Sequence, residues 1–202
     1  MAVQSVKVSI TSIGSNTPLL LNNPQTVDRF NAFAKRIRTI NDKKTRRTDD
    51  DYLELRQLEI TSKLYFDDKI GVYVPGSWLM ESIATNGFKV AKLSRDTVRG
   101  SVFVVSPKMP LDYAGKAKVK TPEDVVSNPE FHWVAGLPQG QVRVMKAFPK
   151  FTAWSFSSLV EFDDKQVDHS SLKRIVEHAA RYNGFGDFRP TFGRATAEVS
   201  DV

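Results

Sequence analysis

Two periodicities of apolar residues divide the chain into predicted strands and helices. Val6, Val8 and Ile10 alternate with polar neighbours, as in a strand with one buried face. The same alternation returns over residues 143–162, the longest strand-like stretch, which Pro149 interrupts. Helical spacing of apolar residues first appears over residues 27–40. Further helices are predicted over 52–62, over 78–92 and from Ser170 to Gly184, and further strands over 64–66, 70–74, 101–106 and 195–199.

The order of these elements favours an α+β fold, because strands and helices interleave with hairpins. A ferredoxin-like (RRM-like) antiparallel sheet of βαββαβ order accommodates the pattern best, with inserted helices and a projecting loop or hairpin. The length suits one sizeable core, so we predict a single domain over residues 1–202.

Two segments interrupt the regular patterns. Residues 41–51 contain no apolar side chain and cannot join a core, so we predict a mobile charged loop. Two interpretations of this loop stay open: an arm that grips phosphate, or a solvated turn whose basic and acidic halves neutralise each other. Residues 107–141 are rich in proline, and we predict an irregular insertion that projects from the domain.

Charge and composition narrow the function. The net charge of +6 and the pI near 9.5 favour an anionic partner such as nucleic acid. The sequence has no cysteine, which excludes disulfides, thiolate catalysis and cysteine-ligated zinc. No apolar run approaches the roughly 18–20 residues of a membrane span. The first residues also lack the pattern of a signal peptide. We therefore predict a cytoplasmic protein with no membrane partner.

Residues suited to catalysis are sparse. His132, His169 and His178 share no metal-ligand spacing, and no serine lies in a G-x-S-x-G elbow. Aspartates do cluster, but at predicted turns and helix starts, where capping and solubility explain them. We predict no enzymatic activity, no metal and no cofactor.

The most distinctive stretch is the glycine loop, residues 184–194, with the sequence GFGDFRPTFGR. A nucleotide-binding glycine loop follows a strand and opens a helix, whereas this one follows a predicted helix and precedes a strand. Gly184 is placed to end the helix in a left-handed conformation. Asp187 is placed to bond backbone amides or Arg189. We predict that the loop is shaped by Gly184, Gly186, Asp187 and Gly193.

The glycine loop resembles the C-terminal signature of the RAMP superfamily, RNA-binding proteins that include backbone subunits of CRISPR effector complexes. Residues 73–79 (YVPGSWL) resemble that family's isoleucine-proline-glycine-serine-serine-leucine segment, and residues 17–21 (TPLLL) are similar to its opening. The chain is also similar to uncharacterised phage proteins of this size that end in glycine-aspartate-aromatic-arginine-proline. It departs from the pattern at Met80-Glu81, where lysine-glycine is expected. RNA-processing members use a histidine near the N-terminal part of the fold, and this chain has none before His132.

The resemblance implies an RRM-like sheet that binds single-stranded nucleic acid, RNA or DNA. It also implies a homo-oligomer or a subunit of a nucleoprotein complex, in the host cytoplasm if phage-encoded. Basic residues interleaved with aromatic ones are typical of such binding, since cations hold phosphates and flat faces stack on bases. The predicted contacts are Lys43, Lys44, Arg46, Arg47, Trp78, Lys92, Arg95, Arg99, Arg143, Lys146, Lys150, Arg189 and Arg194.

Two alternative functions stay open. One is a protein-interaction module, such as a phage inhibitor that mimics a host nucleoprotein subunit. The other is a metal-dependent endonuclease that uses aspartates such as Asp67, Asp68 or Asp187.

Overall fold

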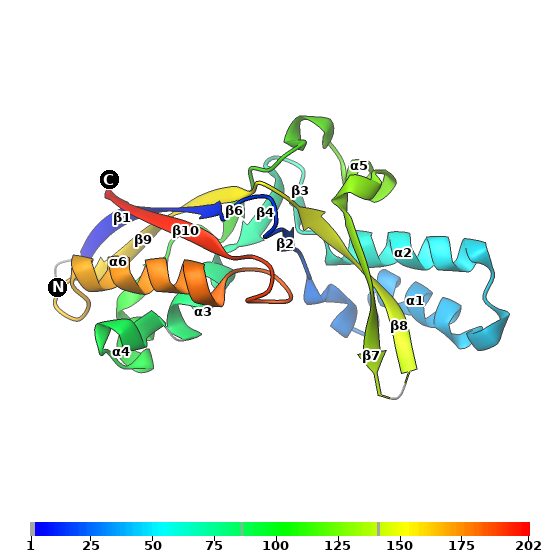
Figure 1. The fold of residues 1–202 in the computed structure, drawn as a ribbon, viewed down its shortest axis with the longest axis horizontal. Helices are drawn as coiled ribbons and strands as arrows, with labels where there is room; N and C mark the ends of the chain where they lie inside the picture. Colours follow the sequence, from blue (N-terminus) through cyan, green and yellow to red (C-terminus); the bar gives the residue numbers. More distant parts are fainter. Residues whose placement is uncertain (1–2, 86, 141) are drawn as a thin grey trace.

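The computed structural model describes residues 3–85, 87–140 and 142–202. The molecule is elongated, with a four-stranded antiparallel sheet at one end and a second group of strands and helices at the other (Figure 1). We call these parts the sheet core and the extension. In spatial order the core strands are β10 (Ala195–Asp201), β1 (Val3–Ser12), β9 (Ser155–Asp163) and β5 (Val102–Val104).

The sheet core has the ferredoxin-like topology that the sequence predicts. Numbered along the chain, its four strands lie in the order 4-1-3-2, and every neighbouring pair is antiparallel. The two crossover helices lie on the same side of this sheet (Figure 1). They are α3 (Gly76–Thr85) and α6 (His169–His178). The α+β class and the RRM-like core are therefore confirmed.

The predicted alternation in the first strand is confirmed by burial. Val6, Val8 and Ile10 are at most 1% exposed, while Lys7 between them faces solvent. Phe156, Val160 and Phe162 give β9 the same inward face, and α6 turns Leu172, Ile175 and Val176 toward it. Burying such side chains stabilises the fold by about 1.5–3 kcal/mol each.

The extension is built from two insertions that lie far apart in the sequence. The first, between β1 and α3, holds β2 (Leu19–Leu20), α1 (Ala32–Asp42), α2 (Asp49–Lys63), β3 (Phe66–Asp67) and β4 (Gly71–Pro75). The second, between β5 and β9, holds β6 (Lys108–Pro110), α5 (Pro122–Ser127), β7 (His132–Gln139) and β8 (Val142–Phe151). Strand β2 pairs with β8 and β4 pairs with β6, so each insertion completes the sheets of the other.

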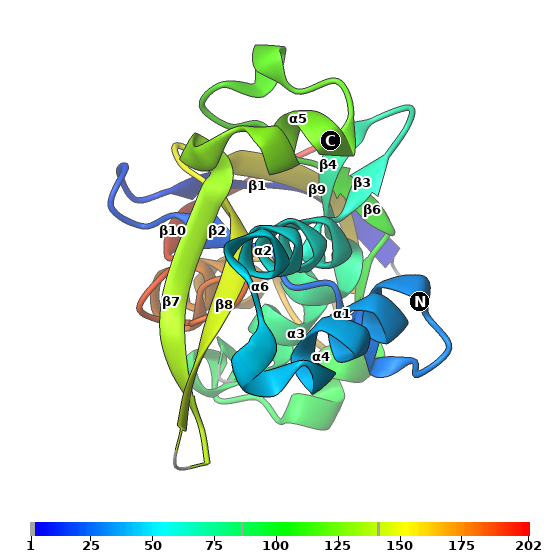
Figure 2. The ribbon, with the colours of Figure 1, turned by 90° about the vertical axis from the view of Figure 1, so that its right-hand side faces the viewer.

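The interior of residues 107–141 is more regular than predicted. It contains β6, α5 and β7, and the projecting feature is the β7–β8 hairpin, which extends away from α2 in Figure 2. Pro138 and Pro149 conceal the strand pattern in the sequence, yet they lie in paired strands. Pro149 has no amide hydrogen to donate, but its carbonyl accepts from the Leu21 amide at 3.0 Å.

The boundaries of two other predicted segments also change. Residues 41–51 are mostly helical, because α1 ends at Asp42, a 3-10 turn covers Lys44–Arg46 and α2 begins at Asp49. The predicted helix over 78–92 is α3 followed by a 3-10 segment, Gly87–Ala91. A short helix, α4 (Arg95–Ser101), follows. The sequence pattern does not reveal α4, because only Val98 and Ser101 in it are buried.

The glycine loop joins the sheet core to the extension by close backbone contact. The amides of Asp187 and Gly193 donate to the carbonyls of Leu20 and Pro18, both at 3.0 Å. A Cβ on Gly186 would lie 2.5 Å from the Leu20 carbonyl oxygen, and one on Gly193 would overlap the carbonyl of Phe185. Both glycines also have positive φ, which other residues rarely adopt. No side chain larger than hydrogen fits at either place.

Gly184 and the start of α6 differ in detail from the prediction. Gly184 has φ +68° and ψ −171°, which lies outside the left-handed helical region, and it follows a π-helical turn rather than the end of an α-helix. The N-cap of α6 is Asp168, whose carboxylate accepts from the Ser171 amide at 2.9 Å, in place of Ser170.

Replacing Gly193 by alanine should destabilise the protein more than the same change at Gly14. Both glycines have φ near +70°, but a Cβ at Gly14 meets nothing within 4 Å. Gly14→Ala therefore carries only the backbone strain, about 1–2 kcal/mol. Gly193→Ala adds an overlap with Phe185 and should cost about 1–3 kcal/mol more in urea unfolding. Equal losses of stability in the two variants would contradict the close-contact interpretation.

Candidate nucleic-acid-binding site

A hollow of about 370 Å³ lies between the α1–α2 turn and strand β8. It brings together Arg47 and Tyr52 from the first insertion with Arg143 and Lys146 from the second. Arg143 is exposed, and so is 43% of Tyr52. Three cations and one exposed ring thus surround a single concave surface, although the sequence separates them by about ninety residues.

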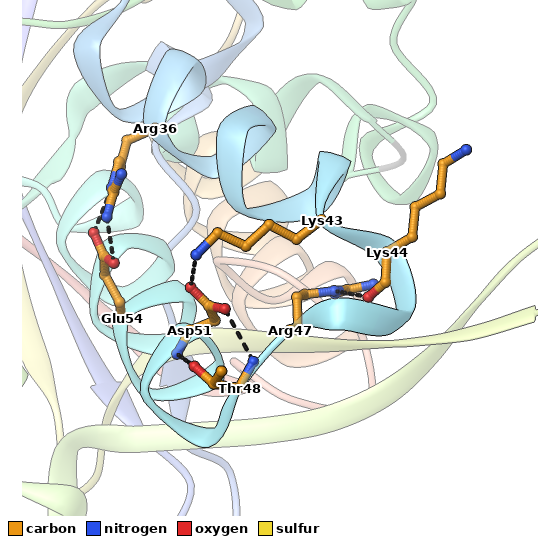
Figure 3. A network of polar contacts seen from close by, with 7 residues as sticks. All are labelled: Arg36, Lys43, Lys44, Arg47, Thr48, Asp51 and Glu54. Atoms are coloured by element: carbon orange, nitrogen blue, oxygen red, sulfur yellow. Dashed lines mark hydrogen bonds and ion pairs between the residues drawn. The ribbon is translucent and has the colours of Figure 1, made fainter.

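The α1–α2 turn is held in shape by its own polar side chains (Figure 3). Thr48 and Asp51 form a capping box, in which the Asp51 amide donates to Thr48 Oγ1 and the Thr48 amide donates to Asp51 Oδ2. Lys43 Nζ donates to Asp51 Oδ1, and this bond is the main reason that the pKa of Asp51 is lowered. Lys43 is thus engaged within the turn, whereas the Lys44 side chain extends into solvent in Figure 3.

The same turn places Arg47 beside Tyr52. Arg47 Nε donates to the Lys44 carbonyl at 3.0 Å, and its guanidinium lies 5.4 Å from the centre of the Tyr52 ring. Lys44 itself has φ +50°, an unusual conformation for a residue with a side chain. Arg47 is therefore oriented by backbone and ring contacts that leave part of its guanidinium free to bind an anion.

A second hollow of about 330 Å³ continues from the first along α1, α2 and β8. The two share Asn41 and Lys146, and the second adds Arg38, Glu59 and Lys63.

Glu59 organises the floor of this second hollow. Its side chain is almost fully buried, and its carboxylate accepts from Lys146 Nζ at 2.8 Å and from the Ala147 amide at 2.6 Å. Lys63 Nζ lies 3.5 Å from the same carboxylate and donates to the Ala147 carbonyl at 2.6 Å. Lys63 also lies over the Phe148 ring, at 3.7 Å. One buried carboxylate thus fixes two lysines against β8.

Burial lowers the pKa of Lys63 to about 8, because desolvation penalises the charged amine more than Glu59 stabilises it. Repulsion from Lys146 lowers this pKa further, while attraction to Asp187 opposes the shift. Phe148, under Lys63, lies 5.4 Å from Phe188 of the glycine loop between ring centres, so Lys63 lies on the side of the second hollow that faces this loop.

A third hollow, of about 170 Å³, lies at the glycine loop. Its lining brings together the three segments whose sequences resemble RAMP motifs. Asn22 directly follows residues 17–21, Trp78 lies within residues 73–79, and three further lining residues belong to the glycine loop. Asn22 Nδ2 donates to Asp187 Oδ2 at 2.7 Å, and Asp187 Oδ1 accepts from the Phe188 amide at 2.8 Å. The lining residues are Asn22, Trp78, Glu81, Gly186, Asp187 and Arg189.

Aromatic side chains of the glycine loop pack on the β7–β8 hairpin. Trp133 lies 4.7 Å from Phe188 and 5.6 Å from Phe192, measured between ring centres, and Phe148 lies 5.4 Å from Phe188. The sequence patterns do not single out Trp133, Tyr52 or Lys63. The one available signal for Lys63 is its i,i+4 spacing from Glu59 near the end of a predicted helix.

The other predicted contacts lie outside these hollows. Lys92 and Arg95 are exposed on the α3–α4 side of the sheet core, and Arg99 lines a separate hollow with Met80 and Phe103. Arg194 is exposed beside the start of β10. The remaining two are Arg46, exposed in the α1–α2 turn, and Lys150, half-buried on β8.

The aspartates named for an endonuclease are bonded to different neighbours. Asp67 pairs with Lys108 at 2.5 Å, which lowers the pKa of Asp67, while Asp187 accepts from Asn22. Over the described ranges of the chain, no three His, Cys, Asp or Glu side chains gather closely enough to hold a metal ion. In those ranges, too, no helix is long and apolar enough to cross a membrane.

Comparison with known proteins gives weak structural similarity and no sequence match. No protein-family model matches the chain, and no curated protein matches it. Among solved structures, Cmr6 from Pyrococcus furiosus, a CRISPR RAMP-type protein, is similar over 98% of this chain and 100% of its own. The identity is 11% and the TM-score 0.38. A similarity this low does not bear on the chemistry of the site, which its own residues must explain.

The depressed pKa of Lys63 makes stability depend on pH above 8. Between about pH 8 and pH 10.5 the folded protein has released this proton and the unfolded chain still holds it, so stability should rise with pH. Lys63→Met lacks this group. The measurement is the free energy of unfolding in urea, for both proteins at pH 7.5 and pH 10. Between these pH values it should rise for the wild type relative to the variant by up to about 3 kcal/mol. Parallel pH dependences would contradict the burial of a charged Lys63.

Proposed function

We propose that this protein binds single-stranded nucleic acid along the three consecutive hollows. The observation that carries the proposal is the convergence of Arg47, Arg143 and Lys146 beside the exposed ring of Tyr52. Cations next to an accessible aromatic face suit a strand whose phosphates and bases are both exposed. A duplex keeps its bases stacked inside, so they could not stack on the Tyr52 ring.

The path continues from the first hollow toward the glycine loop. Asn41 and Lys146 belong to both the first and the second hollow, and Lys63 of the second lies over Phe148, whose ring is 5.4 Å from that of Phe188 in the glycine loop. Arg189 is exposed there and adds a guanidinium at the far end. A bound strand would meet the cations of the first hollow at one end of this path and Arg189, beside two carboxylates, at the other.

The proposed function has three broader parts that come from the sequence. The activity is binding rather than catalysis, and the protein acts as a homo-oligomer or as a subunit of a nucleoprotein complex. Strands β5 and β10 are the two edges of the four-stranded sheet in the described chain, which leaves both sides available for neighbours. A phage origin and a place in the host cytoplasm follow only from the sequence resemblance. Electron micrographs with and without oligonucleotide test the assembly.

Removing two cations from the first hollow should weaken strand binding. The test variant is Arg47→Gln with Arg143→Gln, and the measurement is fluorescence anisotropy with a labelled 15-nucleotide strand across salt concentrations. We expect affinity to fall by about 10–100-fold at low salt. The slope of log K against log salt should shrink by about 0.7 for each phosphate that the variant no longer neutralises.

The matched control removes the same charge at the opposite end of the molecule. Lys165→Gln with Lys173→Gln changes two exposed lysines, the first in the turn between β9 and α6 and the second on α6 (Figure 1). Affinity and salt slope should stay near the wild-type values. An equal loss of affinity in the two double variants would indicate that the strand is attracted by net charge alone. The absence of any binding by the wild-type protein would overturn the proposed function.

A further inference from the structure

The third hollow differs from the other two in carrying two carboxylates at its surface. Glu81 and Asp187 line it together with Arg189, Asn22 and Trp78. Carboxylates repel phosphates, so their presence on a path for a polyanion needs a different partner. The N–H groups of nucleic-acid bases are such partners, because carboxylates accept hydrogen bonds from base edges.

The polar groups of this hollow have unused hydrogen-bonding capacity. Glu81 is exposed on α3, and neither it nor Arg189 is bonded to another side chain in the part of the chain that the structure describes. Asp187 accepts one bond on each oxygen, which leaves further lone pairs on both. The hollow therefore offers an acceptor group and a donor group at the same time.

Guanine matches this combination better than the other bases. Its N1–H and N2 amino group are adjacent donors that suit one carboxylate, and its O6 and N7 are adjacent acceptors that suit one guanidinium. Adenine and cytosine each offer an amino group next to a ring acceptor, and uracil offers one N–H between two carbonyls. We propose that the third hollow binds a single unstacked guanine base. The proposal rests on the proposed function, since the base belongs to the bound strand.

The size of the hollow and the position of Trp78 agree with one base. Its volume of about 170 Å³ is below the roughly 300–1,000 Å³ of pockets for drug-sized ligands. Trp78 is half-buried, and its ring meets Tyr65 edge-on at 5.6 Å and 88°, which fixes the plane of the indole. Gly186 also lines the hollow, and its close packing on Leu20 holds the loop backbone in place there. The recess is rigid on two sides.

The test compares 15-nucleotide strands that differ at one central position. Oligouridine or oligothymidine strands carry guanine, inosine, adenine or cytosine at that position, and anisotropy gives each affinity. We expect guanine to bind about tenfold tighter than adenine or cytosine. Inosine should lose part of this preference, because hypoxanthine lacks the N2 amino group. Equal affinity for all four strands, or a preference for adenine or cytosine, would overturn the guanine site.

Glu81→Gln and Asp187→Asn remove one carboxylate each and keep the side-chain shape. The readout is the ratio of affinities for the guanine and adenine strands, with thermal unfolding as a check on the fold. A ratio near one in either variant supports the proposal, and an unchanged ratio in both overturns it. The control, Glu177→Gln on α6, should keep the wild-type ratio. Strand binding without base preference would leave the proposed function standing, whereas no strand binding at all would defeat both.

Discussion

The structure depends on one close contact between two stretches of backbone, the glycine loop and the segment around β2. Hydrogen bonds from the Asp187 and Gly193 amides to residues 18 and 20 hold them together, and Gly186 and Gly193 leave room for that approach. Phe185 is buried against Trp154 and Phe156, which anchors the loop in the sheet core. Since β2 pairs with β8, the same contact also fixes the extension relative to the core. Asn22 and the glycine-loop groups of the third hollow take their place from it, while Trp78 and Glu81 are carried by α3.

The sheet core could be predicted because its elements are long and periodic. Val6, Val8 and Ile10 in β1, and Leu172, Ile175 and Val176 in α6, show their buried faces directly in the sequence. The extension could not be predicted in the same way. Strand β2 has two residues, and its partner β8 is more than a hundred residues away. Such pairings depend on tertiary contacts that leave no periodicity in the sequence. Residues 107–141 look irregular in the sequence for that reason.

The candidate site shows a similar division. The sequence indicates residue types suited to nucleic-acid binding, including Arg47, Arg143 and Lys146. It does not indicate that the fold brings these three residues into one hollow. It also grouped Lys92, Arg95 and Arg99 with them, although these residues lie beside and in α4, outside the three hollows. Charge and aromatic content along a chain report the chemistry of a surface, while its location depends on the fold. Lys63 escapes prediction because its i,i+4 spacing from Glu59 does not reveal that both side chains are largely buried against β8.

The arrangement of charge along the path has a consequence for how a strand would be held. Glu59 is buried and lies against Lys63 and Lys146, so it offsets much of the positive charge in the middle of the path. Arg47 and Arg143 line the first hollow, whereas Arg189 shares the third hollow with the carboxylates of Glu81 and Asp187. Phosphate attraction is therefore strongest at the first hollow and weaker toward the third. A strand held there by its phosphates can turn a base into the recess at the glycine loop, where carboxylates accept hydrogen bonds from base N–H groups.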